Sequence, residues 1–203
     1  MRFRLIESED IGQLSNEYDS EGNQLTKAQA EFFKNSKVRD SKGRLLVCYH
    51  GTDEEFDTFS KRHIGTNTGN LGWYGFGFYF FNNIFAARDF SSIGKVKRCY
   101  INLTNPFIWD YYNSIDDINK LSVESGVKLT PIWNINVKNR FEIKPLEDSD
   151  DEINFTKYLI SKGYDGVINA IAYDNEIVAF EPNQIKSITN KNPTNSDNIN
   201  EDK

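Results

Sequence analysis

Metal-binding and redox-active side chains are scarce in this sequence. Its 203 residues include two His, two Cys and one Met, and no CxxC or HxxxH spacing occurs. We expect no metal site, because zinc needs three or four Cys, His or carboxylate ligands. Cys48 and Cys99 both lie in apolar, strand-like runs, so we expect two buried, reduced thiols rather than a disulfide.

Long apolar runs and an excess of positive charge are lacking as well. No apolar run approaches the roughly 20 residues that cross a bilayer, and the first residues, MRFRLIESEDIGQL, lack the apolar core of a signal peptide. The formal net charge of −6 argues against non-specific binding to nucleic-acid backbones or anionic membranes. We therefore expect a cytoplasmic protein with no membrane partner.

The residues that are plentiful indicate one domain with an aromatic-rich core, since aromatics make up 14% of the chain. Helices are predicted, from apolar spacing and capping residues, at 25–36, 82–92, 114–125 and 149–163. Strands are predicted within residues 41–52, 76–81, 96–110 and 164–189. Helices and strands do not alternate regularly, so the pattern favours an α+β fold of mostly antiparallel strands.

The segments outside these elements set the domain boundaries. Residues 1–24 are polar and are interpreted as an N-terminal lead-in, and residues 25–189 as the catalytic or binding domain. Residues 190–203 have almost nothing to bury and are predicted to be a disordered tail. Residues 53–75 form a long glycine-containing loop, which in a compact domain is functional or disordered, and residues 126–147 remain ambiguous.

The run YHGT ends the first predicted strand with a histidine and a glycine. His50 follows an apolar strand, and Gly51 stops the pairing. One interpretation is a strand-terminal histidine of no special role. The other is a neutral imidazole that hydrogen-bonds a ligand hydroxyl, with Gly51 baring its backbone N–H and C=O for close approach.

The run GWYGFGFYF combines glycines and aromatic rings. Its glycines are spaced GxxGxG and precede a strand, which disfavours a dinucleotide-binding fingerprint of the form GxGxxG. In a strand, Phe76, Phe78 and Phe80 share one face and are most simply core. Tyr79 lies on the other face beside Gly77, which would leave open space over its ring for stacking.

A carboxylate accompanies apolar residues in the run DNEIVAFEP. Glu176 shares a strand face with Val178 and Phe180. It is either an exposed residue at the end of the strand or a group that serves a site, and the run by itself favours the exposed residue.

Taken together and in this order, these runs resemble a known class of enzymes. HGT, a glycine-rich loop, GFGFYFFNN with AARDF, then GYDGVI and NEIVAFEPNQIKSI are similar to the diphtheria-toxin-like, His-Tyr-Glu class of ADP-ribosyltransferases, which includes the poly(ADP-ribose) polymerases. More narrowly, LTKAQAEFFKNSKVRDSKGRLLVCYHGT and FEPNQIKSI resemble the ADP-ribosyltransferase domains of phage and mobile-element polyvalent proteins. The resemblance covers roughly residues 25–189.

The resemblance implies a split, mostly antiparallel β-core with flanking helices that clamps NAD, the ADP-ribose donor. It places His50 on the adenosine ribose 2′-hydroxyl and the backbone of Gly51 on the nicotinamide amide. Tyr79 and Phe90 would stack on the two sides of nicotinamide, and Glu176 would stabilise the oxocarbenium-like transition state. His50, Tyr79 and Glu176 are thus the expected catalytic residues, with no metal.

The remaining NAD-binding expectations are less direct. Thr52 completes the HGT motif and is included in the NAD-binding set. Residues 53–75 would cover the adenosine side. Arg62 or His63 could reach a phosphate or the adenine there, although a solvated loop charge is the favoured interpretation. Where the polymerases carry a serine on the nicotinamide amide, this chain has Ala87, so one polar contact is missing.

The function expected from the resemblance is transfer of ADP-ribose from NAD to an acceptor, with release of nicotinamide. Mono-ADP-ribosylation of a macromolecule is favoured, with protein preferred over nucleic acid because of the acidic net charge. The two alternatives are an NAD glycohydrolase, in which water is the acceptor, and a catalytically inactive NAD-binding or structural module. We further expect a monomeric, toxin-like effector of a phage or mobile element that acts in the cytoplasm of its host or target cell.

Overall fold

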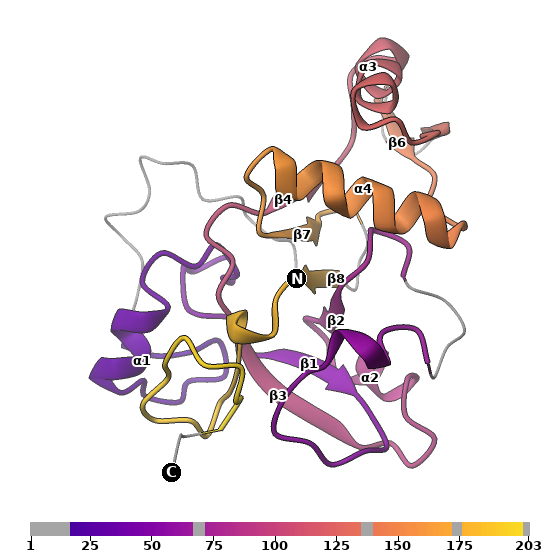
Figure 1. The fold of residues 1–203 in the computed structure, drawn as a ribbon. Helices are drawn as coiled ribbons and strands as arrows, with labels where there is room; N and C mark the ends of the chain where they lie inside the picture. Colours follow the sequence, from indigo (N-terminus) through magenta and orange to yellow (C-terminus); the bar gives the residue numbers. More distant parts are fainter. Residues whose placement is uncertain (1–16, 67–71, 135–139, 172–175, 201–203) are drawn as a thin grey trace.

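A seven-stranded sheet forms the centre of the molecule (Figure 1). The computed structural model describes residues 17–66, 72–134, 140–171 and 176–200. The strand order is β4-β7-β8-β2-β1-β3-β9, and every adjacent pair is antiparallel except β4 and β7. The strands are β1 (Cys48–Gly51), β2 (Phe78–Phe81), β3 (Val96–Ile101), β4 (Phe107–Trp109), β7 (Gly166–Asn169), β8 (Glu176–Ala179) and β9 (Ile185–Ser187). The predicted α+β class with a mostly antiparallel sheet is confirmed.

The four predicted helices are also present, and each begins at a side chain that caps it. They are α1 (Lys27–Phe32), α2 (Ile84–Arg88), α3 (Ile115–Ser125) and α4 (Ser149–Ser161). Their N-terminal caps are Thr26, Asn83, Ser114 and Asp148, whose side chains accept backbone N–H groups of the first turn. In the described part of the chain, none of these helices is long and apolar enough to span a membrane.

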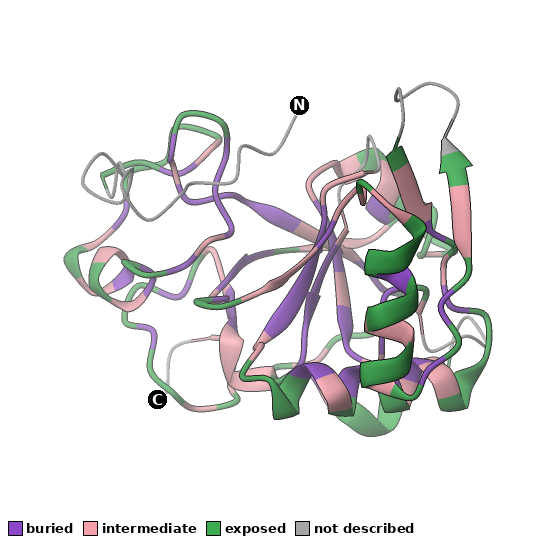
Figure 2. Cartoon of the chain, turned by 90° about the horizontal axis from the view of Figure 1, so that it is seen from above, coloured by how far each residue is buried: buried purple, intermediate pink, exposed green. Residues whose placement is uncertain are grey.

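The two faces of the sheet are covered by different elements, and buried residues concentrate on the strands between them (Figure 2). On one face, α4 packs Phe155 and Leu159 against Trp109, Val167 and Val178 of β4, β7 and β8. The other face packs aromatic and aliphatic residues of the predicted long loop and of the C-terminal segment against β1, β2, β3 and β8. These covering residues are Phe56, Phe59, Ile64 and Ile199.

The ambiguous segment 126–147 contains a small separate hairpin. The strands β5 (Pro131–Asn134) and β6 (Arg140–Ile143) pair with each other in antiparallel register. Residues 135–139 lie outside the described residues. Tyr112 and Phe141 exchange backbone hydrogen bonds of 2.6 and 2.8 Å, which attach this hairpin to the chain that follows β4.

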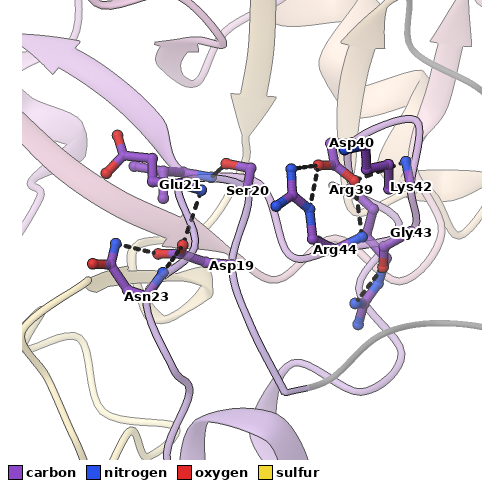
Figure 3. A network of polar contacts seen from close by, with 10 residues as sticks. Asp19, Ser20, Glu21, Asn23, Arg39, Asp40, Lys42, Gly43 and Arg44 are labelled. Carbon is purple, nitrogen blue, oxygen red and sulfur yellow. Dashed lines mark hydrogen bonds and ion pairs between the residues drawn. The ribbon is translucent and has the colours of Figure 1, made fainter.

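Buried polar side chains near the N-terminus form hydrogen bonds with main-chain atoms that are close to them in sequence (Figure 3). Asp19 is fully buried and accepts hydrogen bonds from the backbone N–H groups of Glu21 and Asn23, at 2.9 and 2.8 Å. Arg39 is also buried and donates to the carbonyls of Ser36 and Gly43, at 2.9 and 3.1 Å. Part of the predicted lead-in is thus packed against the domain, whereas residues 1–16 lie outside the described residues.

The C-terminal segment differs from its predicted disorder. Residues 190–200 pack on the sheet, and Ile199 is only 3% exposed within the main core. The buried amine of Lys186 donates to the carbonyls of Ser196 and Asn198, and Ser187 N–H donates to Ile199 O at 2.8 Å. Hydrogen bonds to a buried lysine, together with one apolar anchor, order a segment whose composition is almost entirely polar.

The two cysteines are buried and not joined, as predicted. Cys48 of β1 and Cys99 of β3 are directly opposite each other in the antiparallel register. Burial raises the pKa of Cys99 to about 12. Both groups are therefore thiols at neutral pH, and they serve as small apolar side chains of the core.

Candidate functional site

The three predicted catalytic residues lie on three adjacent strands of the sheet. His50 is on β1, Tyr79 on β2 and Glu176 on β8, in the order β8-β2-β1. Glu176 is paired with Phe81, which shares a strand face with Tyr79, so Glu176 and Tyr79 project from the same side of the sheet. His50 and Glu176 are 126 positions apart in sequence, and this strand order places their strands on the two sides of β2.

His50 connects β1 to β2 through its side chain. Its Nδ1 is 2.8 Å from the backbone carbonyl of Tyr79, and because a carbonyl can only accept, Nδ1 carries the proton. The ring packs edge-on against Phe59, with centroids 5.0 Å apart, and also contacts Phe80. Burial lowers the pKa of His50, despite the opposing hydrogen bond to Tyr79. A neutral imidazole results, with Nε2 as a hydrogen-bond acceptor.

Gly51 is placed where β1 and β2 stop pairing. Thr52 N–H donates to Lys95 O at 3.1 Å, so the alternation of the β1–β3 ladder turns the amide and carbonyl of Gly51 toward β2. The β1–β2 register consists of the pair Tyr49 and Phe81. If the β1–β2 pairing continued, the Tyr79 carbonyl would accept a hydrogen bond from the Gly51 N–H. It instead accepts one from Nδ1–H of His50. This arrangement directs a backbone donor and acceptor of Gly51 toward the Tyr79 side of the site.

Only glycine fits at position 51. A Cβ atom there would lie 1.9 Å from the carbonyl oxygen of Ala87 and 3.1 Å from the Cβ of Phe90. The backbone of α2 is therefore packed directly over Gly51. Ala87 is fully buried at this contact.

Tyr79 is held by the loop that precedes its own strand. Its hydroxyl donates to Gly75 O at 2.7 Å and accepts from Tyr74 N–H at 2.9 Å. Gly72 lies beside the ring, because a Cβ there would be 2.1 Å from two ring carbons of Tyr79. Burial raises the pKa of Tyr79 well above its ordinary value, so the phenol is neutral at physiological pH. The two hydrogen bonds of the hydroxyl and the contact with Gly72 hold the ring in one orientation.

The expected role of Gly77 is wrong. A Cβ at Gly77 would meet Val178 Cγ1 at 2.5 Å and Ala179 O at 2.7 Å, so this glycine accommodates the close approach of β8. It does not leave open space over Tyr79. The glycine at the ring is Gly72, which the sequence pattern does not single out.

Phe90 lies after α2 and is half-exposed, at 50%. Its ring stacks on Phe81, with centroids 5.1 Å apart and an interplanar angle of 24°. Phe81 shares a strand face with Tyr79, so Phe90 is on the same side of β2 as Tyr79 and Glu176. A direct ring contact links Phe90 to Phe81 and not, among the described contacts, to Tyr79.

Glu176 is half-buried at the first residue of β8 and has two partners that sequence reasoning missed. Asn169, at the end of β7, is 1% exposed and donates from Nδ2 to Glu176 Oε2 at 3.3 Å. Burial raises the pKa of Tyr74, and the charge of Glu176 and a hydrogen bond to it raise it further. A polar residue ending the apolar run GVIN is a signal that could have identified Asn169; for Tyr74 the sequence offers no comparable signal.

The other two residues predicted to bind NAD are Thr52, which follows β1, and Arg62, which lies in the loop before β2. Thr52 is buried, and its hydroxyl accepts from Glu54 N–H at 3.1 Å, which serves the local turn. Arg62 is exposed on the 3-10 turn Lys61–His63. That turn is attached to the chain after β8 by an ion pair of 2.6 Å between Lys61 and Glu181. The structure does not bring Arg62 into contact with His50, Tyr79 or Glu176.

Tyr79, Phe90 and Glu176 offer two aromatic rings and a carboxylate on one side of the sheet, whereas the neutral imidazole of His50 packs on the other side, against Phe59 and Phe80. Among the described residues, no group of three or more His, Cys, Asp or Glu side chains could hold a metal ion. A carboxylate next to aromatic rings can stabilise a developing positive charge on a sugar ring. The rings and the outward-turned backbone suit a flat ligand that carries an amide.

The mixed α+β architecture of this chain, with its large and mostly antiparallel sheet, is consistent with an ADP-ribosyltransferase fold. A family model described as "ADP-Ribosyltransferase in polyvalent proteins" matches residues 40–195. This match spans more than half of the chain, so the chain belongs to that family. No curated protein and no solved structure matches it. Members of ADP-ribosyltransferase families transfer ADP-ribose and use NAD as the donor substrate.

Proposed function

We propose that this protein transfers a single ADP-ribose unit from NAD to a macromolecular acceptor and releases nicotinamide. The family match supports ADP-ribosyl transfer in general. The observation that carries the proposal for this chain is the projection of Glu176 and Tyr79 from one side of adjacent strands, beside the outward-turned backbone of Gly51.

In the proposed complex, each residue has one task. Nε2 of His50 accepts a hydrogen bond from the 2′-hydroxyl of the adenosine ribose, since Nδ1–H already donates to Tyr79 O. The backbone of Gly51 bonds the nicotinamide amide, which compensates in part for the serine that Ala87 replaces. The rings of Tyr79 and Phe90 lie against nicotinamide.

The proposed reaction breaks the bond between C1′ of the nicotinamide ribose and the pyridinium nitrogen. The bonding electron pair leaves with nicotinamide, which becomes neutral, and positive charge develops on the ribose. The Glu176 carboxylate stabilises this charge, because it is fixed close to the ring before the bond breaks. The acceptor then forms the new bond to C1′ and loses a proton.

The acceptor is proposed to be a protein side chain. The net charge of −6 disfavours attraction to bulk nucleic acid, because phosphate backbones are recognised mainly through positive charge. An effector or toxin-like role in the cytoplasm of a host or target cell accords with membership of a family found in polyvalent proteins.

Incubation of the protein with labelled NAD and a cell lysate tests this proposal. The expected result is label on protein together with free nicotinamide. Free ADP-ribose without labelled macromolecules would instead establish a glycohydrolase. An absence of nicotinamide release would overturn both activities and leave an inactive binding module.

Glu176→Gln tests the assignment of the carboxylate. It preserves shape but removes the charge, so transfer should fall by about 100-fold or more, while NAD binding measured by calorimetry persists. Glu181→Gln is the matched control, because Glu181 is exposed and paired with Lys61. Loss of activity in E181Q with normal turnover in E176Q would show that Glu181 is the catalytic glutamate.

A further inference from the structure

We infer that Tyr74 and Asn169 are positioning residues for Glu176, which together hold its carboxylate on the Tyr79 side of the sheet. This inference rests on the proposed function. Neither residue belongs to the His-Tyr-Glu pattern, and each comes from a different element of the chain: Tyr74 from the loop before β2, and Asn169 from the end of β7.

The amide of Asn169 is fixed before it contacts Glu176. Its Oδ1 accepts from Ile171 N–H at 3.0 Å, so the amide nitrogen must point the other way, where it donates to Glu176 Oε2 at 3.3 Å. The β7–β8 register pairs Ile168 with Ile177, and this places Asn169 and Glu176 next to each other at the ends of their strands. Because Asn169 is 1% exposed, its amide is shielded from competing water.

Tyr74 contacts two members of the proposed site with its two ends. Its backbone N–H donates to the Tyr79 hydroxyl at 2.9 Å. The pKa of its phenol is raised by burial, and further by the charge of Glu176 and a hydrogen bond to it. Its ring packs edge-on against Trp109, with centroids 5.1 Å apart, in the core beneath α4. A single buried residue therefore links the aromatic wall of the site to the carboxylate.

The donors have an electrostatic consequence for Glu176. Hydrogen bonds donated to a carboxylate favour its ionised form, which is the form that stabilises positive charge. Other carboxylates of neighbouring elements act on the two tyrosines. Burial raises the pKa of Tyr74 and of Tyr79, and Glu142 of β6 and Glu152 of α4 raise these two pKa values further. Tyr74 and Asn169 favour the ionised form of Glu176 by keeping donors on its carboxylate.

Tyr74→Phe tests the inference with the smallest change, since it removes one hydroxyl and keeps the ring on Trp109. We expect kcat for nicotinamide release to fall about tenfold, because a hydrogen bond to a charged group is lost, with a smaller change in KM for NAD. The acidic limb of the pH–kcat profile should move up by about one pH unit, because Glu176 then protonates more readily.

Tyr112→Phe is the matched control. Tyr112 is half-buried and packs against the same core cluster, but the groups that act on its pKa are Asp110, Tyr164 and Asp117 rather than Glu176. It should leave the acidic limb in place. Asn169→Asp adds a nearly isosteric negative charge beside Glu176 and should move the limb further upward than Asn169→Leu does.

A ¹³C NMR titration of the Glu176 carboxyl, assigned with Glu176→Gln, provides a readout without turnover. A higher Glu176 pKa in Tyr74→Phe than in wild type is expected. An unchanged Glu176 pKa and an unchanged acidic limb would overturn the inference. If wild type releases no nicotinamide, the proposed function fails, whereas the NMR comparison still decides whether Tyr74 and Asn169 hold Glu176.

Discussion

Two groups of buried polar side chains in this molecule differ in where their partners come from. In the N-terminal group, Arg39 donates to main-chain carbonyls within six residues of itself, and Asp19 accepts nearby backbone N–H groups in addition to the hydroxyl of Tyr100 on β3 (Figure 3). In the group around Glu176, the partners are side chains from other elements, such as Asn169 of β7 and Tyr74 of the loop before β2. The first arrangement closes local turns, and the second assembles chemically reactive groups from distant parts of the chain.

This difference indicates how to separate structural from functional polarity here. A buried charge whose donors and acceptors are local backbone groups stabilises a turn, and its loss should affect folding. A buried polar group that contacts other titratable side chains across strands tunes their protonation, and its loss should affect turnover and its pH dependence. The following substitutions test that separation.

Gly51→Ala should have the largest effect. The added methyl would lie 1.9 Å from the carbonyl oxygen of Ala87, so α2 and the neighbouring Phe90 must move away from β1. We expect loss of measurable nicotinamide release and of NAD binding. Gly94→Ala is the control, because its Cβ meets no atom within 4 Å although its φ is +70°; it should cost about 1 kcal/mol of stability and leave activity intact.

Arg39→Met should lower stability while sparing turnover. It removes donors from the carbonyls of Phe33, Ser36 and Gly43 in a buried setting, at a cost of about 3 kcal/mol in the free energy of unfolding. Urea denaturation measures this loss. If kcat per folded molecule drops as well, the N-terminal group is coupled to the site and the proposed separation is incorrect.

His50 should give the smallest effect, seen as a pH dependence of stability. Its pKa is lowered in the folded state by burial from an unfolded value of 6.5. The unfolded state therefore binds the proton more readily, and stability is lost as pH falls through the interval below about 6.5. His50→Gln should flatten the pH dependence of the unfolding free energy in that interval, and His63→Gln, an exposed control, should not.

Much of the fold was predictable because its signals are local. The caps Thr26, Ser114 and Asn83 and the alternating aromatic strand each mark an element by their own chemistry. The order of the tail was not predictable, because Ile199 and the carbonyls that bond Lys186 acquire partners only after folding. Residues 1–16, 67–71 and 201–203 lie outside the described residues.

The candidate site divides in the same way. The expected positions His50, Tyr79 and Glu176 came from motif resemblance, and the structure places them on the strands β1, β2 and β8. Tyr74 was missed because its importance depends on which side chains it meets, and Asn169 had only the local signal of a polar residue that ends an apolar run. Gly72 and Gly77 were indistinguishable in sequence, yet only Gly72 lies against Tyr79.

The sequence by itself determined the class, the four helices, the strands of the main sheet, the reduced cysteines and the residue types proposed for the site, because these follow from local propensity, apolar periodicity and short motifs. The tertiary structure alone decided that β8, β2 and β1 are neighbours, that the loop before β2 accepts a hydrogen bond from the Tyr79 hydroxyl, and that α2 covers Gly51. The physical reason is that strand order and close packing are settled by burial of the whole core, and this couples residues that are remote in sequence.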